Sequence, residues 1–197
     1  SMFQALGILV LAWALAAVCA PEHLDTAGYL VDAVGQGLPV QWMPALSFIL
    51  AAVIALATGS SFSTMALLIP LSLPISWNLL AADTTMQADP AHPLMLATLG
   101  AVLAGAIFGD HCSPISDTTV LSSAAAGCDH LDHVATQAPY AVVVAGIALL
   151  AGYVPVGFGV PIVVCLPLGI AAAIACPLLV GRRIGPAADE KTTMTDQ

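Results

Sequence analysis

Residues 109–119 read Gly-Asp-His-Cys-Ser-Pro-Ile-Ser-Asp-Thr-Thr, a polar and acidic break within an otherwise apolar stretch of the chain. An ionised side chain at membrane depth costs at least about 2.5–3.5 kcal/mol on insertion scales, so such a group usually faces a cavity, a partner or an ion. This break contains two carboxylates, Asp110 and Asp117. It therefore decides both the expected fold and the expected site.

The composition of the whole chain is that of a membrane protein. Hydrophobic residues make up 59% of the 197 positions and charged residues only 8%, far from the balance of a soluble domain. All three basic residues, Arg182, Arg183 and Lys191, follow the last apolar run. Nucleic-acid binding needs basic patches that this chain lacks, so the expected partner is the lipid bilayer. The five cysteines show no zinc-binding spacing and are expected to be free thiols.

Hydrophobic length predicts an all-α polytopic membrane protein with one membrane domain, residues 1–184. Segments 3–20, 138–154 and 161–181 each have about the 17–25 residues of a single membrane helix. Segments 44–80 and 93–127 are longer, and small polar residues interrupt both of them. We expect the polar end, 185–197, to be a disordered cytoplasmic tail.

Segment 44–80 is predicted to form a re-entrant hairpin. A polar stretch, Thr58–Thr64, separates its two apolar arms, and Trp42 and Trp77 stand near their outer ends. Interfacial tryptophans would place both ends at the same membrane face. A single kinked helix of this length would extend about 55 Å at about 1.5 Å per residue, too long for one crossing.

Segment 93–127 is predicted to be a broken helix. Ser113 is a candidate N-cap and Pro114 a candidate first helical residue. Asp117 then falls in the first turn of the second half-helix, and Asp110 lies in unwound chain before the cap.

The two breaks together predict a cation site. A membrane helix is interrupted only where its freed backbone groups line a cavity or pack against protein, and those carbonyls and helix ends can hold ions. Sodium is a hard cation that prefers oxygen ligands. We expect an aspartate here to hold either a proton or Na+; the alternatives are a structural cap for the aspartates and a turn that satisfies its own backbone for the hydroxyls. The candidate ligands are Asp110, Asp117, Ser113, Ser116, Thr118, Thr58, Ser60 and Ser61.

Three histidines are candidates for pH sensing, because imidazole titrates near neutral pH. His111 lies in the break, where a satisfied core histidine is the alternative. His130 and His133 belong to the Asp129–His133 cluster, for which helix capping, loop structure and a metal site are alternatives.

The basic pair Arg182 and Arg183 predicts the orientation. By the positive-inside rule the C-terminus lies in the cytoplasm. Counting spans backwards places loop 128–137 in the cytoplasm and segments 21–41 and 81–92 outside. The expected location is the cytoplasmic membrane, as a multi-pass protein.

Several stretches resemble the signature of the NhaC-type sodium/proton antiporters. They are FGDHCSPISDTTVLSS at 108–123, GCDHLDH at 127–133 and TQAPY at 136–140. ATGSSFST at 57–64 is similar to the family's Ala-Thr-Gly-Thr-Ser-Trp-Gly-Thr, with Ser60, Phe62 and Ser63 as the departures.

The resemblance implies an ion-transporter fold of two inverted repeats, each with a re-entrant hairpin and a broken helix, and sodium/proton exchange without a cofactor. It covers nearly the whole chain, but this chain corresponds to about the C-terminal half of such a transporter. Either the chain is a fragment, or an N-terminal repeat or second subunit completes the site. A homo-oligomer is a further option.

The leading hypothesis is a transporter, not an enzyme, in which Na+ and H+ compete for Asp110 and Asp117. A sodium-coupled exchanger of organic anions such as malate or lactate is an alternative. An intramembrane metal-dependent hydrolase using His111, His130 and His133 is another, although the chain has neither HExxH nor GxSxG. A subunit that is inactive by itself is the third.

Overall fold

The computed structural model describes residues 38–83, 86 and 88–180, with isolated positions among the first 37 residues. The predicted span 3–20 and the tail 185–197 lie outside the described residues. Five helical segments are long and apolar enough to cross a membrane, and no strand occurs among the described residues, so the predicted all-α polytopic fold is confirmed. The elements are η2 (Val40–Trp42), α3 (Met43–Thr58), α4 (Ser61–Ala82), α5 (Pro93–Cys112), α6 (Asp117–Ala126), α7 (His130–Ile147), the π-helical η3 (Ala148–Tyr153), α8 (Val154–Gly157) and α9 (Ile162–Val180).

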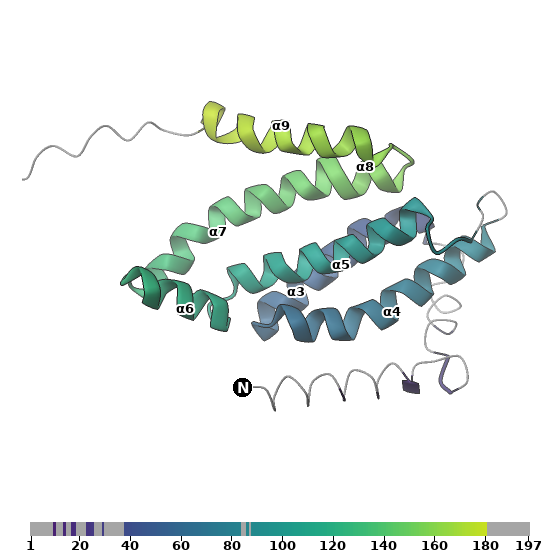
Figure 1. Ribbon diagram of the computed structural model, residues 1–197, viewed down its shortest axis with the longest axis horizontal. Coiled ribbons are helices and arrows are strands. Elements are labelled where there is room, and N and C mark those ends of the chain that lie inside the picture. The colour runs from purple at the N-terminus through teal and green to yellow at the C-terminus, as the bar shows by residue number, and fades with distance from the viewer. Residues whose placement is uncertain are drawn as a thin grey trace, which may run out of the picture.

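Segment 44–80 folds as two helices that meet at Gly59 and Ser60, not as one kinked helix. Gly59 ends α3 in the left-handed conformation, with φ +65°, and its N–H donates to the Ala55 carbonyl. Ser60 caps α4, because its hydroxyl accepts from the Ser63 N–H. The chain therefore reverses within two residues, and α4 runs back along α3 (Figure 1). The re-entrant placement of this hairpin in a membrane stays a prediction.

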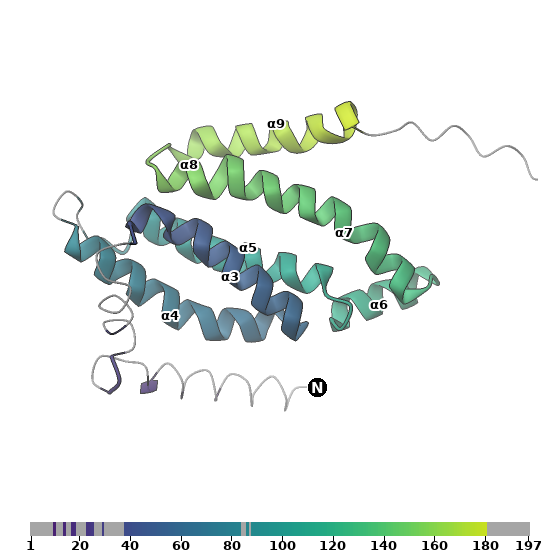
Figure 2. The same cartoon turned by 180° about the vertical axis from the view of Figure 1, so that it is seen from behind.

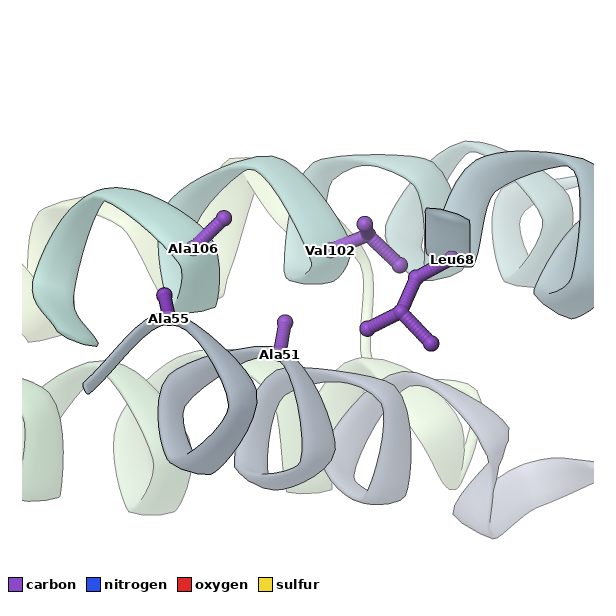
Figure 3. Close-up of a cluster of buried hydrophobic side chains, with 5 residues drawn as sticks. All are labelled: Ala51, Ala55, Leu68, Val102 and Ala106. Carbon is purple, nitrogen blue, oxygen red and sulfur yellow. The ribbon is translucent and has the colours of Figure 1, made fainter. Parts of the chain in front are cut away.

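Helices α3 and α5 form the most closely packed pair of the bundle. Ala51 and Ala55 of α3 face Val102 and Ala106 of α5, and Leu68 of α4 closes the cluster from the side (Figure 3). All five side chains are buried. Small side chains let membrane helices approach closely and gain van der Waals contact.

Two glycines of α5 bring its backbone against the backbone of α3. A Cβ at Gly105 would overlap the Phe48 carbonyl oxygen, and a Cβ at Gly109 would overlap the Ala52 carbonyl oxygen. Gly105, Gly109 and the buried Ala101 are spaced by four residues, so they share one face of α5. We call these three residues with Ala51, Ala52 and Ala55 the small-residue seam.

Helix α7, the π-helical η3 and α8 form one continuous helical segment, which we call the rod. The rod, followed by α9, packs on the side of the α3–α5 pair that is opposite α4 (Figures 1 and 2). Aromatic contacts join the rod to the bundle: the Phe48 and Tyr153 rings lie 5.2 Å apart, and Trp42 meets Phe158 edge to face at 5.3 Å. The Tyr153 hydroxyl also donates to the Gly100 carbonyl of α5 at 3.1 Å. Most side chains of α9 are exposed, as expected of a surface that faces lipid or protein.

The rod corrects one prediction. Residues 128–137 were expected to form a cytoplasmic loop that precedes a membrane span at 138–154. In the structure, a helical segment already begins at His130 and continues to Gly157. The helix starts early because one carboxylate oxygen of Asp129 accepts from the N–H groups of Leu131 and Asp132, at 2.9 and 3.2 Å. Hydrophobic length detects only the apolar part of such a helix. The last predicted span, 161–181, agrees closely with α9.

Candidate cation-binding site

The break in segment 93–127 occupies residues 113–116, between α5 and α6. The predicted cap was wrong: Ser113 is the C-cap of α5, and Ser116 holds the N-cap position of α6. Pro114 is therefore in the break, not in the first helical turn. The reason is that α5 continues to Cys112, while the Ser113 hydroxyl accepts only from the nearby Ile115 N–H, at 3.4 Å.

The greater length of α5 changes the position of Asp110. This residue lies in the last turn of α5, not in unwound chain as predicted. Asp117 is the first residue of α6, so its predicted place in the first turn is correct. The two carboxylates thus stand on opposite sides of the break.

Asp110 is the centre of a cluster of three side chains, which we call the Asp110 triad: Asp110, Ser116 and Thr118. The Asp110 side chain is buried, with 4% of its surface exposed. The Ser116 hydroxyl donates to Oδ1 at 2.8 Å, and the Thr118 hydroxyl donates to Oδ2 at 3.2 Å. The two hydroxyl oxygens are also only 2.8 Å apart. These contacts cross the break and tie the start of α6 to the end of α5.

The hairpin tip touches this break. A Cβ built on Gly59 would lie 2.8 Å from Ile115 Cγ1 and 3.0 Å from the Ile115 carbonyl oxygen. Both views show the α3–α4 turn and the end of α5 at the same end of the bundle (Figures 1 and 2). The two breaks, which are more than fifty residues apart in sequence, therefore meet in space.

The hydroxyls of the hairpin tip are occupied by local contacts. The exposed Thr58 hydroxyl donates to the Ile54 carbonyl of its own helix at 2.9 Å. Ser60 and Ser63 contact each other at 3.0 Å, and the Thr64 hydroxyl donates to the Ser60 carbonyl at 2.9 Å. Ser61 is half-buried at the start of α4. The alternative that this turn satisfies its own backbone accounts for the contacts of Ser60 and Thr64.

Asp117 differs from Asp110 in exposure and in contacts. Its side chain is exposed at the first position of α6. Among the residues that the structure describes, it makes no hydrogen bond or ion pair. The structure therefore brings Ser116 and Thr118 to Asp110, and it does not bring Asp117, Thr58, Ser60, Ser61 or Ser113 there.

The three candidate histidines occupy different environments. His111 is exposed at the end of α5, and His133 is half-buried on α7. His130 is bonded through both ring nitrogens: Nε2 lies 2.7 Å from the Pro114 carbonyl oxygen and Nδ1 lies 3.1 Å from the Ser123 hydroxyl. Both His130 nitrogens and one Asp129 oxygen are therefore engaged in hydrogen bonds, and the part of the chain that the structure describes contains no group of three or more His, Cys, Asp or Glu side chains that could hold a metal ion.

The small-residue seam, which supports the site, was not among the features predicted from the sequence. Gly109 is next to Asp110, and its contact with the Ala52 backbone fixes the end of α5 against α3. The sequence does contain a pattern typical of close helix packing, because small residues recur every four positions in both helices. They are Ala51, Ala55 and Gly59 in and just after α3, and Ala101, Gly105 and Gly109 in α5.

A family model described as the Na+/H+ antiporter family matches residues 1–158 of the chain. The chain belongs to the Na+/H+ antiporter family. This agrees with the resemblance to NhaC-type antiporters and makes the chain part of a transporter family, not an enzyme family. Together with the five apolar helices of its described part, this family membership indicates that the chain is a multi-pass membrane protein.

Individual proteins match shorter or longer parts of the chain. An uncharacterized protein of Haemophilus influenzae is 42% identical over 158 residues, which are 80% of this chain and 28% of that protein. The Na+/H+ antiporter NhaC of Alkalihalophilus pseudofirmus is 32% identical over 94 residues, 48% of this chain and 18% of NhaC. The arginine/ornithine antiporter ArcD of Halobacterium salinarum is 38% identical over 119 residues, 60% of this chain and 22% of ArcD.

These matches cover less than a third of each relative's length. No solved structure matches the chain significantly.

Proposed function

We propose that this chain contributes the cation-binding part of a Na+/H+ antiporter of the cytoplasmic membrane, in which Asp110 binds Na+ and H+ in turn. The observation that carries the proposal is the Asp110 triad, a buried carboxylate with two hydroxyl oxygens in contact with it and with each other. Carboxylate and hydroxyl oxygens are the ligands that a hard cation prefers.

Counting hydrogens supports this role. The triad has three oxygen–oxygen contacts within hydrogen-bonding distance, but the two hydroxyls of Ser116 and Thr118 supply only two hydrogens. With Asp110 ionised, one contact lacks a hydrogen. A proton on Asp110 would complete the triangle, and a cation among the three oxygens would compensate the same deficit. Competition between H+ and Na+ at one carboxylate follows from this chemistry.

The surrounding helix ends favour a cation as well. The contact between Gly59 and Ile115 places the C-terminal end of α3 near the break, and the C-terminal end of α5 forms the break itself. The carbonyl end of a helix carries partial negative charge, as at the ion sites of transporters with discontinuous helices. Asp117, exposed at the start of α6, is proposed to attract cations toward the triad. Thr58, Ser60, Ser61 and Ser113 would join the site only after leaving their present positions.

The remaining part of the transporter is proposed to complete this site. An N-terminal repeat, whether on the same polypeptide or on a second subunit, would move against the part described here to give alternating access. A homo-oligomer is compatible with this arrangement. Arg182 and Arg183 place the C-terminus in the cytoplasm in this proposal.

The test is Na+-dependent proton flux in proteoliposomes that contain the complete transporter. Asp110→Asn should reduce the flux at least about 100-fold, because an amide can neither release a proton nor supply a charged ligand. Asp132→Asn is the matched control, since Asp132 is an exposed aspartate on α7 that takes no part in the hydrogen bonds of the triad. Equal flux in the wild-type and Asp110→Asn proteins would overturn the proposal.

A second candidate substrate is an organic cation such as arginine. The relative ArcD is named an arginine/ornithine antiporter. The specific observation is charge: no Lys or Arg precedes Arg182, whereas the break has two carboxylates. An organic anion of the malate or lactate type would find no basic partner in this part of the protein. Arginine and ornithine should then inhibit the Na+-dependent flux, and no inhibition at millimolar concentration would exclude this substrate class.

A further inference from the structure

The His130 imidazole connects two segments that are distant in sequence. Its Nε2 contacts the Pro114 carbonyl in the break, sixteen residues earlier, and its Nδ1 contacts Ser123 on α6. We propose that His130 is a positioning residue, which holds the break in the geometry that the Asp110 triad needs to bind a cation. The inference rests on the proposed function, because it concerns the same site.

The Pro114 carbonyl lies in the middle of the break. Backbone hydrogen bonds hold the two ends of the break. Ser113 N–H donates to the Asp110 carbonyl at 3.1 Å, and Ser116 N–H donates to the Ser113 carbonyl at 3.3 Å, while the Ser116 carbonyl accepts from Val120 N–H at 3.0 Å. The carbonyl of Pro114 has the His130 ring as its partner, at 2.7 Å. A backbone carbonyl outside regular secondary structure is paired by a side chain or by water.

This contact acts on the residues that the site uses. Ile115, next to Pro114, is the residue that packs against Gly59 of the hairpin tip. Ser116 follows it and donates to Asp110 at 2.8 Å. The imidazole therefore fixes the chain two residues before a hydroxyl of the triad.

The chemistry of the partners sets the position of the ring hydrogens. A carbonyl oxygen only accepts, so Nε2 must carry a hydrogen. The Ser123 hydroxyl also lies 2.9 Å from the Val120 carbonyl. A neutral ring would accept at Nδ1 from Ser123, whereas a charged ring would donate there and leave Ser123 bonded to Val120. In both states the Nε2–H bond to Pro114 is kept, so the positioning role needs no change of charge.

The test distinguishes the role of Nε2 from the role of Nδ1. In the complete transporter, His130→Ala should raise the Na+ concentration for half-maximal flux about tenfold, the effect of one lost hydrogen bond, with the maximal rate nearly unchanged. His130→Gln should restore the wild-type value, because a glutamine amide reaches the position of Nε2. His130→Asn should not restore it, because an asparagine amide reaches only the position of Nδ1. His133→Gln on the same helix is the matched control.

The outcomes are distinct from those of the proposed function. Flux in Asp110→Asn equal to wild type would overturn the proposed function, and the inference with it. Loss of flux in Asp110→Asn with unchanged Na+ dependence in His130→Ala would overturn the inference alone. Restoration by Asn as well as by Gln would also overturn it, as would a fall in maximal rate and in the amount of folded protein without any change in Na+ dependence.

Discussion

The two breaks of the chain are similar in composition and different in structure. The hairpin tip, Thr58–Thr64, is rich in hydroxyls that cap α4 and bond to their own turn. The break at residues 113–116 and the first turn of α6 direct two hydroxyls to a buried carboxylate. The difference teaches that hydroxyls become candidate ligands where a carboxylate lies within reach, and remain helix caps where none does.

The largest expected effect comes from removing the hydroxyls of one break and then of the other. Ser116→Ala with Thr118→Val should weaken the apparent Na+ affinity by about 100-fold, because two hydrogen bonds to a carboxylate are lost. Ser60→Ala with Ser63→Ala should leave the affinity within about twofold and lower stability by about 1 kcal/mol, the usual value of an N-cap. Titration of flux against Na+, with thermal unfolding in detergent, measures both. Equal losses of affinity in the two double variants would remove the distinction between the breaks.

The next effect tests the contact between the breaks. Gly59 and Gly127 both end a helix at φ +65° and ψ +26°, but only Gly59 has neighbours within 4 Å of an added Cβ. Gly127→Ala should cost about 1–2 kcal/mol for the left-handed conformation. Gly59→Ala should cost about 1–3 kcal/mol more, because its methyl group would displace Ile115. Equal melting temperatures for the two variants would show that the tip and the break do not press on each other.

The smallest effect concerns the second aspartate. Asp117→Asn should change the Na+ concentration for half-maximal flux by only about two- to threefold, since an exposed charge is screened by water and salt. The change should disappear above about 0.5 M of an inert potassium salt, if K+ is not itself transported. An effect as large as that of Asp110→Asn would make the two carboxylates equivalent.

The sequence predicted the positions of both breaks and included Asp110, Ser116 and Thr118 among eight candidate ligands, but it did not predict the detail of each helix end. Ser113 and Ser116 are both plausible caps, one followed by proline and the other by aspartate. The choice depends on how far α5 continues, and its last turns are held by contacts of Gly105 and Gly109 with α3. Those contacts are tertiary, so local sequence rules do not contain them.

Two other differences have the same origin. His130 was placed in a loop, because the polar first turns of α7 do not add to hydrophobic length. Its contact with Pro114 depends on how α6 and α7 fold back on the break, which no local pattern specifies. Length and composition thus locate apolar segments, while capping carboxylates such as Asp129 and packing between helices decide where the helices end.

The small-residue seam has a mechanical consequence. Because the backbones of α3 and α5 touch at Phe48, Ala52, Gly105 and Gly109, these two helices cannot slide or separate without losing contacts along much of their length. We therefore expect the two helices to move together. A change of shape within the described part is then expected to involve α4 or α6, turning at the breaks in residues 59–60 and 113–116.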